Sequence, residues 1–383
     1  MKKIIFRSVT LLLFTVLVYS AGMAQEKDKT SSKDKDDDNF YLQDFHSSPG
    51  AWGAIIKTDK IHIQFGGVHW NTGRNFQLNE FSSLPAAGKE GEFSLKREAG
   101  TVFFSGKFND NKGQGTYRFE ENASFKSFLT QQGFTNINEA LMLHIFFTDI
   151  NQSWFDFMKL NGYGPLTPLQ LKDLAEHDMN KKLLADYFEL FKNEGYGKPG
   201  LEKIIEMRDH GASAAFIMGF KKAGYKDIPL DKAIELVDHG VSINFITGFG
   251  MKDITLDQSV ELADHGVNPA FIKALTDMGY KDISLEKAIE LVDHGVSINF
   301  LKEFRQLGYK DITADKARDL VDHGVNPAFV KEIKAIGFPD ISLDRAIELR
   351  DHGVTAEYIK KMQKKGMNNL KLEEYQKLKD AGI

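Results

Sequence analysis

Residues 279–307 read GYKDISLEKAIELVDHGVSINFLKEFRQL, and this stretch decides the fold because versions of it recur through the second half of the chain. The tripeptide Asp-His-Gly occurs six times, with histidines at His210, His239, His265, His294, His323 and His352. Their successive separations are 29, 26, 29, 29 and 29 residues. A repeat of this length is typical of one helix-turn-helix unit stacked on copies of itself. The sequence therefore predicts an α-solenoid, which favours a binding surface over an enzyme.

Each unit is predicted to hold two short helices. Ser284 can cap the first helix with its hydroxyl, and Gly295 follows the C-cap, where φ is often positive. Ser297 caps the second helix, and in two other units Asn268-Pro269 and Asn326-Pro327 give the same start signal. Apolar residues fall on one face of each helix: Leu285, Ala288, Ile289 and Val292 in the first, and Phe300, Leu301, Phe304 and Leu307 in the second.

Recurring glycines predict eight full units and a final half unit: Gly133, Gly162, Gly195, Gly224, Gly250, Gly279, Gly308, Gly337 and Gly366. Helices of about ten residues are too short to persist alone in water, so the units should fold and unfold cooperatively. The stretch 180–195 is four residues longer than its equivalent and 242–250 is three shorter, which predicts second helices longer and shorter by one turn. Asp149 and Asp178 replace the Gly of Asp-His-Gly in the first two units.

Before the repeats, residues 40–130 show period-two alternation. We predict strands in 54–56, 61–65, 93–97, 101–104 and 116–119, forming a small antiparallel β domain. The fold class is then α+β, with the β domain followed by a helical-repeat domain over 131–383. The last half unit, ending Asp380-Ala381-Gly382-Ile383, is expected to close the open end of the stack as a lone helix.

The N-terminal segment predicts export to the periplasm or the extracellular space. Residues 1–24 have a basic start, an apolar run and small residues for cleavage, which is typical of a signal peptide; a retained anchor is the alternative. We expect no membrane span after cleavage. Residues 25–39 are charged and predict a disordered spacer. The chain has no cysteine, which excludes disulfides and Cys-based zinc sites.

The charge balance bears on the partner. The formal net charge is −5, and loss of the three cations Lys2, Lys3 and Arg7 leaves −8 in the mature chain. An acidic protein is a poor match for nucleic acid or anionic lipid, because both need a basic footprint.

Residues 100–108, GTVFFSGKF, and 113–119, GQGTYRF, precede repeats of the form G-Y-x-D-[IL]-[ST] that end in H-G-V. From roughly Phe93 onward the chain resembles the extracytoplasmic tail of some bacterial membrane metallopeptidases of the β-lactam-sensor antirepressor type. The zinc-protease motif H-E-x-x-H of those sensors does not occur here. The resemblance therefore implies only an accessory sensing or interaction portion, and no catalytic residue carries over.

The six histidines are the main candidate ladder, with three interpretations. A metal ladder needs nitrogens within roughly 4 Å of one another, which one histidine per unit in helices about 8–10 Å apart rarely supplies. A pH sensor is the second interpretation. The third is structural: each histidine ends a helix, where the dipole favours imidazolium, and bonds a last carbonyl or the neighbouring unit.

Other candidates have a structural alternative each. The aromatic residues after the marker glycines, Tyr225, Tyr280, Tyr309 and Phe338, indicate either a ligand stripe or packing between units. Lys-Asp pairs at 226–227, 252–253, 281–282 and 310–311 indicate solvated loops or a polar binding face. Trp52, Trp70 and Trp154, with His62 and His69, indicate core packing or, around Trp70 and His69, a small site. Residues 109–113 indicate a hairpin turn rather than a calcium loop.

No nucleophile-elbow, P-loop or Rossmann glycine motif occurs, so we predict a protein that is not an enzyme and needs no cofactor or metal. The favoured function is an exported protein-interaction or sensing module whose partner is another envelope or periplasmic protein. The alternative is an envelope structural protein or a cell-wall or saccharide-binding protein.

Overall fold

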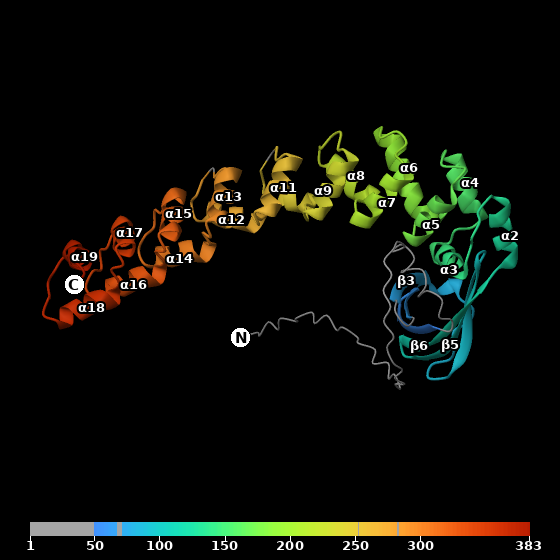
Figure 1. Ribbon diagram of the computed structural model, residues 1–383, viewed down its shortest axis with the longest axis horizontal. Coiled ribbons are helices and arrows are strands. Elements are labelled where there is room, and N and C mark those ends of the chain that lie inside the picture. Colours follow the sequence, from blue (N-terminus) through green and yellow to red (C-terminus); the bar gives the residue numbers. More distant parts are fainter. Residues whose placement is uncertain (1–49, 67–70, 252, 282) are drawn as a thin grey trace, which may run out of the picture.

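The computed structural model describes residues 50–66, 71–251, 253–281 and 283–383. A curled antiparallel sheet stands at one end, and an elongated arch of short helices runs away from it (Figure 1). The predicted α+β fold, with a β domain followed by helical repeats, is confirmed. The predicted signal peptide and spacer, together with His69 and Trp70, lie outside the described residues.

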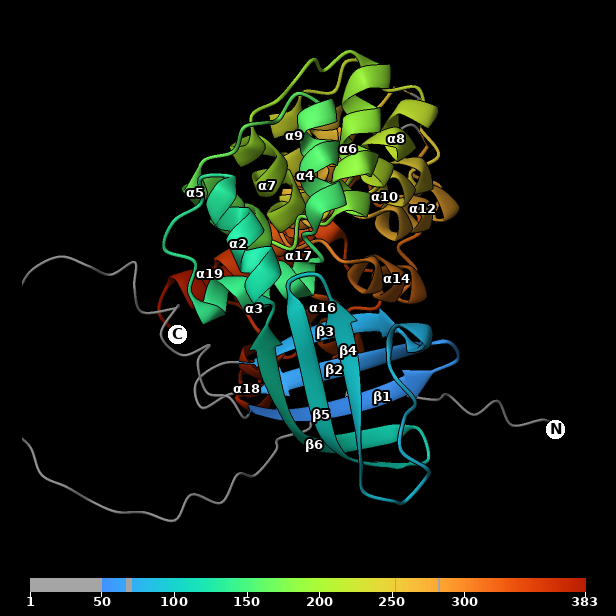
Figure 2. The same ribbon diagram turned by 90° about the vertical axis from the view of Figure 1, so that its right-hand side faces the viewer.

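The sheet has six strands in the order β3-β2-β1-β6-β5-β4, and every neighbouring pair is antiparallel. Their bounds are β1 Gly50–Lys57, β2 Lys60–Gly66, β3 Asn71–Gln77, β4 Gly91–Arg97, β5 Gly100–Asn109 and β6 Lys112–Glu121. Figure 2 shows β1–β3 crossing behind β4–β6, so the sheet curls around its own apolar face. The five predicted strands are confirmed, whereas β3 was missed because its sequence NTGRNFQ is almost entirely polar. The turn between β5 and β6 is a two-residue hairpin, as predicted.

The indole of Trp52 fills the inside of the curl. Its Nε1 donates to the backbone oxygens of Thr116 at 3.0 Å and Ser105 at 3.4 Å. Gly106 and Gly115 face each other across β5 and β6, and a Cβ on Gly115 would lie 1.9 Å from the carbonyl oxygen of Ser105. The glycines of the motif over 100–119 therefore permit close strand approach beneath a tryptophan.

Among the described residues, α2 is followed by eight helix pairs and the single helix α19, which confirms the predicted eight and a half units. The bounds of α2 to α10 are Ala123–Gln131, Glu139–Thr148, Gln152–Leu160, Pro168–Glu176, Lys181–Glu194, Leu201–His210, Ala214–Lys222, Leu230–Asp238 and Ile243–Gly248. Those of α11 to α19 are Leu256–Asp264, Pro269–Asp277, Leu285–Asp293, Ile298–Gln306, Ala314–Asp322, Pro327–Ala335, Leu343–Asp351, Ala356–Lys364 and Leu372–Asp380.

The predicted caps are present. The side chains of Ser284, Ser297, Asn268 and Asn326 accept from the amide three residues on, at 3.2, 3.1, 3.0 and 2.8 Å. The second helices also change length as predicted: α6 has 14 residues and α10 has six, against nine in most others.

The two aspartates at glycine positions adopt the glycine conformation. Asp149 has φ 56° and Asp178 has φ 54°, close to the left-handed values of the repeat glycines such as Gly295 at 79°. Aspartate tolerates this region better than most side chains, so the first two units keep the same turn without glycine.

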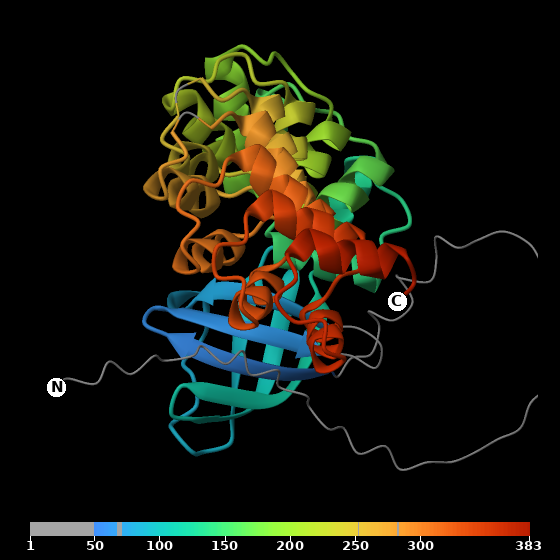
Figure 3. The same cartoon turned by 90° about the vertical axis from the view of Figure 1, so that its left-hand side faces the viewer.

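The stack twists along its length. In Figure 1, α4, α6 and α8 form the upper row near the sheet, whereas α13, α15, α17 and α19 form the upper row toward the C-terminus. Figure 3 looks along the stack from its C-terminal end, with the sheet below the helices. None of the helices in the described ranges is long and apolar enough to cross a membrane.

The sheet joins the stack through one shared core, which we call the sheet–solenoid junction. The ring of Phe65 in β2 lies 4.8 Å from that of Phe147 in α3. Arg97 at the end of β4 donates through Nη1 to the backbone oxygens of Phe146 at 2.8 Å and Phe147 at 3.0 Å. Arg97 thus caps the C-terminal end of α3, where carbonyls lack helical partners. The predicted domain boundary at 130–131 falls at the end of α2.

Candidate functional site

The six histidines line one edge of the stack, and each contacts the next unit. Each stands at the C-terminal end of a first helix, and its Nδ1 reaches the last aspartate of the next unit's first helix, which is α19 for His352. The Nδ1–oxygen distances are 2.7 Å for His210–Asp238, 2.8 Å for His265–Asp293, 2.7 Å for His294–Asp322, 2.8 Å for His323–Asp351 and 2.7 Å for His352–Asp380, and His239 contacts Asp264 in the same way. We call this series the histidine ladder.

Sequence reasoning missed a seventh member. His177 contacts Asp209 at 2.6 Å, although its own unit reads Glu-His-Asp rather than Asp-His-Gly. The sequence contains the signal, because His177 directly precedes Asp178, which stands at the glycine position. One unit earlier Thr148 stands in the histidine position, and its hydroxyl donates instead to the backbone oxygen of Ala175 at 2.8 Å.

Two members of the ladder favour the charged imidazole. The hydrogen bond to Asp238 raises the pKa of His210, and the bond to Asp293 raises the pKa of His265. Both rings are about two-fifths exposed, so solvent screens each pair. Within the described ranges no group of three or more His, Asp or Glu side chains is placed to hold a metal ion.

A second ladder runs along the same first helices, which we call the lysine–aspartate ladder. A lysine near the start of one first helix contacts the acid at the start of the next. The Nζ–oxygen distances are 2.5 Å for Lys203–Asp231, 2.6 Å for Lys232–Asp257, 2.7 Å for Lys287–Asp315 and 2.5 Å for Lys316–Asp344. Each of these lysines also contacts an acid one turn further along its own helix.

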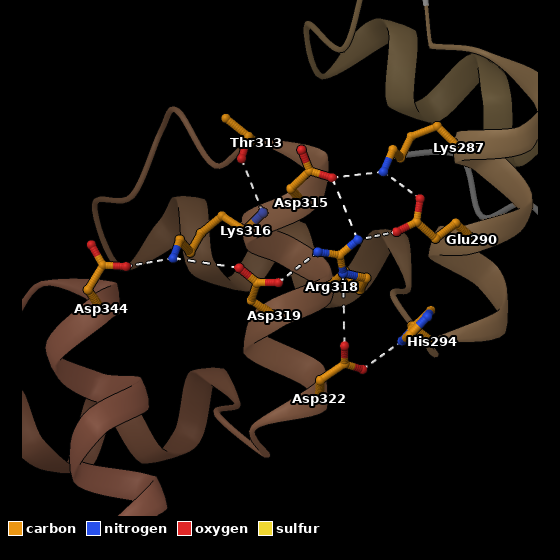
Figure 4. Close-up of polar contacts among 10 residues, drawn as sticks. All are labelled: Lys287, Glu290, His294, Thr313, Asp315, Lys316, Arg318, Asp319, Asp322 and Asp344. Carbon is orange, nitrogen blue, oxygen red and sulfur yellow. Dashed lines mark hydrogen bonds and ion pairs between the residues drawn. The ribbon is translucent and has the colours of Figure 1, made fainter.

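The two ladders meet around Arg318 (Figure 4). Arg318 stands where other first helices carry Ile234, Ile289 and Ile347. Its guanidinium contacts Glu290 of α13 and, at 3.0 Å, Asp319 of its own helix. These hydrogen bonds raise the pKa of Arg318 above its ordinary value, with Glu290 the larger cause. The arginine thereby joins α13 to α15 beside the histidine ladder.

Tyrosines bind neighbouring units by their hydroxyl groups. Tyr163, Tyr196 and Tyr225 donate to backbone oxygens of the next unit at 2.9, 2.7 and 2.7 Å, and Tyr309 does so at 2.5 Å. The predicted aromatic set Tyr225, Tyr280, Tyr309 and Phe338 is half-buried against the core. The predicted packing of these residues between units is therefore confirmed.

The remaining candidates are structural. Trp52 and Trp154 are buried, and Trp154 Nε1 donates to the backbone oxygen of Met179 at 3.0 Å. His62 is exposed and shares a hydrogen bond of 3.0 Å with Asn75 on β3. The described members of the loop Lys-Asp pairs, such as Lys226 and Lys310, are exposed, as predicted for solvated loops.

A buried histidine at the sheet–solenoid junction was not singled out from the sequence. His144 lies on α3, and burial lowers its pKa to about 4, with the charges of Arg74 and Lys172 lowering it further. Arg74 of β3 in turn pairs with Asp178 at 3.0 Å. His144 is thus neutral at pH 7, and a position inside an apolar helix gives no sequence signal for this.

The two rows of helices differ in charge. The first helices α7, α9, α11, α13, α15 and α17 carry 18 acidic and 8 basic residues, a net −10 with histidine neutral. The second helices α8, α10, α12, α14, α16 and α18 carry 4 acidic and 10 basic residues, a net +6. The solenoid therefore has an acidic row and a basic row.

The basic row leaves cations exposed. Lys302, Lys331 and Lys360 occupy the same place in α14, α16 and α18, at 29-residue spacing, and all are exposed. No ion pair links any of the three to another residue in the described part of the chain. We call them the lysine face. By contrast, the lysines of the lysine–aspartate ladder are all engaged.

Comparisons with protein-family models, with curated proteins and with solved structures found no match to this chain. A depression of about 200 Å³ between α7 and α9 is lined by Glu206, Asp231, Glu235, Asp238 and His239. Most of these side chains already belong to the two ladders, so the depression is the space between paired charges.

Proposed function

We propose that this protein is an exported, non-catalytic protein-interaction module, and that its lysine face binds an acidic surface of another envelope protein. The observation that carries the proposal is that basic side chains form ion pairs between units on the first helices but not at the lysine face. On the first helices lysine and arginine bridge neighbouring units, whereas Lys302, Lys331 and Lys360 contribute no bridge and repeat along one exposed face.

Charge complementarity indicates the partner's chemistry. A face with one lysine per unit attracts carboxylates spread over an extended surface, and such attraction mainly raises the association rate and the specificity. The net −8 expected for the mature chain argues against a polyanion as the general target, because the acidic row would repel it. A folded acidic protein can approach the basic row alone.

The test is crosslinked capture from the envelope with the full chain. The variant Lys302→Glu/Lys331→Glu/Lys360→Glu reverses the lysine face, and Lys226→Glu/Lys281→Glu/Lys310→Glu reverses three exposed loop lysines as a control of equal charge. We expect the native chain and the loop control to recover the same acidic protein, and the face variant to lose it. The recovered protein is then purified and its binding measured at two salt concentrations, with weaker binding expected at high salt.

Equal recovery by all three proteins would place the contact elsewhere, and recovery of no reproducible partner would contradict the proposal. The second candidate, a structural or cell-wall-binding role, is separated by sedimentation with purified cell wall. Co-sedimentation that survives in the face variant would favour it.

A further inference from the structure

The joints between neighbouring units are not equal. From α5 to α18, most joints include an ion pair from lysine or arginine, a tyrosine hydroxyl bond to the next unit, or both. The joint before α11 has both: Lys232 contacts Asp257 at 2.6 Å, and Tyr225 donates to the backbone oxygen of Ile254 at 2.7 Å. We compare these contacts with the joint between the unit 250–278, which holds α11 and α12, and the unit 279–307, which holds α13 and α14.

At this joint two repeat positions carry side chains that cannot make the usual contacts. Met251 stands at the tyrosine position, so it has no hydroxyl to offer the carbonyl of Ile283. Gln258 stands at the lysine position, so it has no ammonium group to offer Glu286. Its amide instead accepts from the backbone amide of Thr255 at 3.0 Å, within its own helix.

Two polar contacts remain in the described part of this joint, one on each row. On the first-helix row, His265 contacts Asp293 at 2.8 Å. On the second-helix row, the guanidinium of Arg305 in α14 donates to the backbone oxygen of Met278 at the end of α12. Among the described residues, the first-helix row of this joint is therefore held by a single exposed ion pair, whereas α13 and α15 are held by His294, Lys287 and Arg318 together.

The buried core also divides here. The described core residues form two clusters, and the division falls within these two units. Ile272, Ala288 and Ile289 belong with the sheet-side cluster, whereas Leu275 and Leu291 belong with the C-terminal one. Each cluster thus draws buried residues from both units, and the half-buried Phe271 and Ile283 pack against both clusters. Apolar contact therefore continues across this joint, which lacks the two polar repeat contacts.

We propose that this joint is the hinge of the solenoid, bending by separation of α11 from α13 about the α12–α14 side, with His265–Asp293 as its latch. The hinge would set the angle between the sheet-bearing arm and the C-terminal arm, which carries all three residues of the lysine face. Contacts within the chain alone would control this hinge, whichever partner the lysine face binds.

The latch is titratable. Asp293 faces His265 from α13, and Glu261 and Asp264 lie near it on α11, while His239 from α9 binds Asp264. The hydrogen bond to Asp293 raises the pKa of His265, so the imidazolium form persists below that raised pKa and its charge is lost as pH rises through it. The hinge should therefore open more at pH 8.5 than at pH 5.5.

The experiment measures distances between spin labels in the full chain. Because the protein has no cysteine, two introduced cysteines are the only labelling sites. Lys222→Cys with Lys364→Cys spans the hinge, and Lys302→Cys with Lys364→Cys lies within the C-terminal arm as the reference; all three positions are exposed. We expect the spanning distribution to be broader than the reference and to broaden further at pH 8.5.

Variants sharpen the test. Asp293→Asn should broaden the spanning distribution at both pH values, and the matched control Asp322→Asn, where Lys287 and Arg318 still link α13 to α15, should leave it unchanged. Gln258→Lys with Met251→Tyr restores the two repeat contacts and should narrow the distribution and remove its pH dependence. A spanning distribution as narrow as the reference, or one that these restoring substitutions fail to narrow, would overturn the hinge.

Discussion

The sheet–solenoid junction and the stack beyond α7 are held together in different ways. At the junction, large aromatic rings from β2, β6 and α3 pack at close range, and two arginines enter from the sheet. Beyond α7, neighbouring first helices are joined at their rims by exposed pairs of opposite charge. The junction should therefore depend on shape and burial, whereas the stack should respond to salt and pH.

The largest effect is expected from adding a side chain where β5 and β6 approach each other most closely. Gly115→Ala places a Cβ 1.9 Å from the carbonyl oxygen of Ser105, so a strand must shift, and we expect a loss of about 3 kcal/mol or more in the free energy of unfolding. Denaturant titration measures it. The control is Gly53→Ala in β1, where the nearest atom would be 4.0 Å away; a similar loss in both variants would contradict the packing argument.

The second-largest effect is expected from removing the guanidinium of Arg97, which should weaken the contact between the sheet and α3. Arg97→Met keeps the stem but leaves the carbonyls of Phe146 and Phe147 without their donor, at a cost of about 2–3 kcal/mol. Arg118→Met is the control, because its partner Glu120 is exposed and the pair should contribute under about 1 kcal/mol. Equal costs would show that Arg97 acts only as a surface charge.

The buried histidine of the junction predicts acid sensitivity. Its folded pKa of about 4 lies below the ordinary 6.5, so its contribution is complete above pH 6.5 and is lost as pH falls toward 4. We expect about 2 kcal/mol of lost stability from His144 between pH 7 and pH 5. His144→Gln should flatten that part of the curve; a variant with unchanged acid sensitivity would remove His144 as the cause.

In the stack, Arg318→Ile restores the apolar residue of other units and should change the free energy of unfolding by less than about 1 kcal/mol, because exposed ion pairs contribute little. The sharper readout is salt. Raising the salt concentration should lower the free energy of unfolding more in the native chain than in the variant. Identical salt dependence would show that the ion pairs in Figure 4 do not contribute to stability.

The smallest effect concerns the histidine ladder. Raised folded pKa values for His210 and His265 mean that their contribution is present below 6.5 and lost as pH rises through the folded pKa. The melting temperature should therefore fall slightly from pH 6 to pH 8.5, the reverse of the His144 effect. His210→Gln/His265→Gln should lessen that fall. A melting temperature of the native chain that rises toward alkaline pH would contradict the predicted direction of the pH dependence.

Features set by neighbouring residues could be predicted from the sequence, whereas contacts between distant residues could not. Repeat length, helix caps and the glycine-like role of Asp149 were readable because each depends on residues close together in the chain. Strand β3 was not, because its polar residues pair with β2 without an apolar alternation. The partner of His210 was also hidden: Asp238 is 28 residues away, and only the stacking of units brings the two together.

The acceptor and the donor of each unit are adjacent residues, as in Asp293-His294, and this has a consequence for how such a chain can change length. A duplicated or deleted whole unit would find both its acceptor and its donor matched by new neighbours, leaving no orphan charge in the series. Thr148 at one end and Ala381 at the other cannot extend it, because neither is an imidazole. Duplication of an interior unit thus preserves every histidine–aspartate pair, whereas Thr148 and Ala381 end the series of pairs.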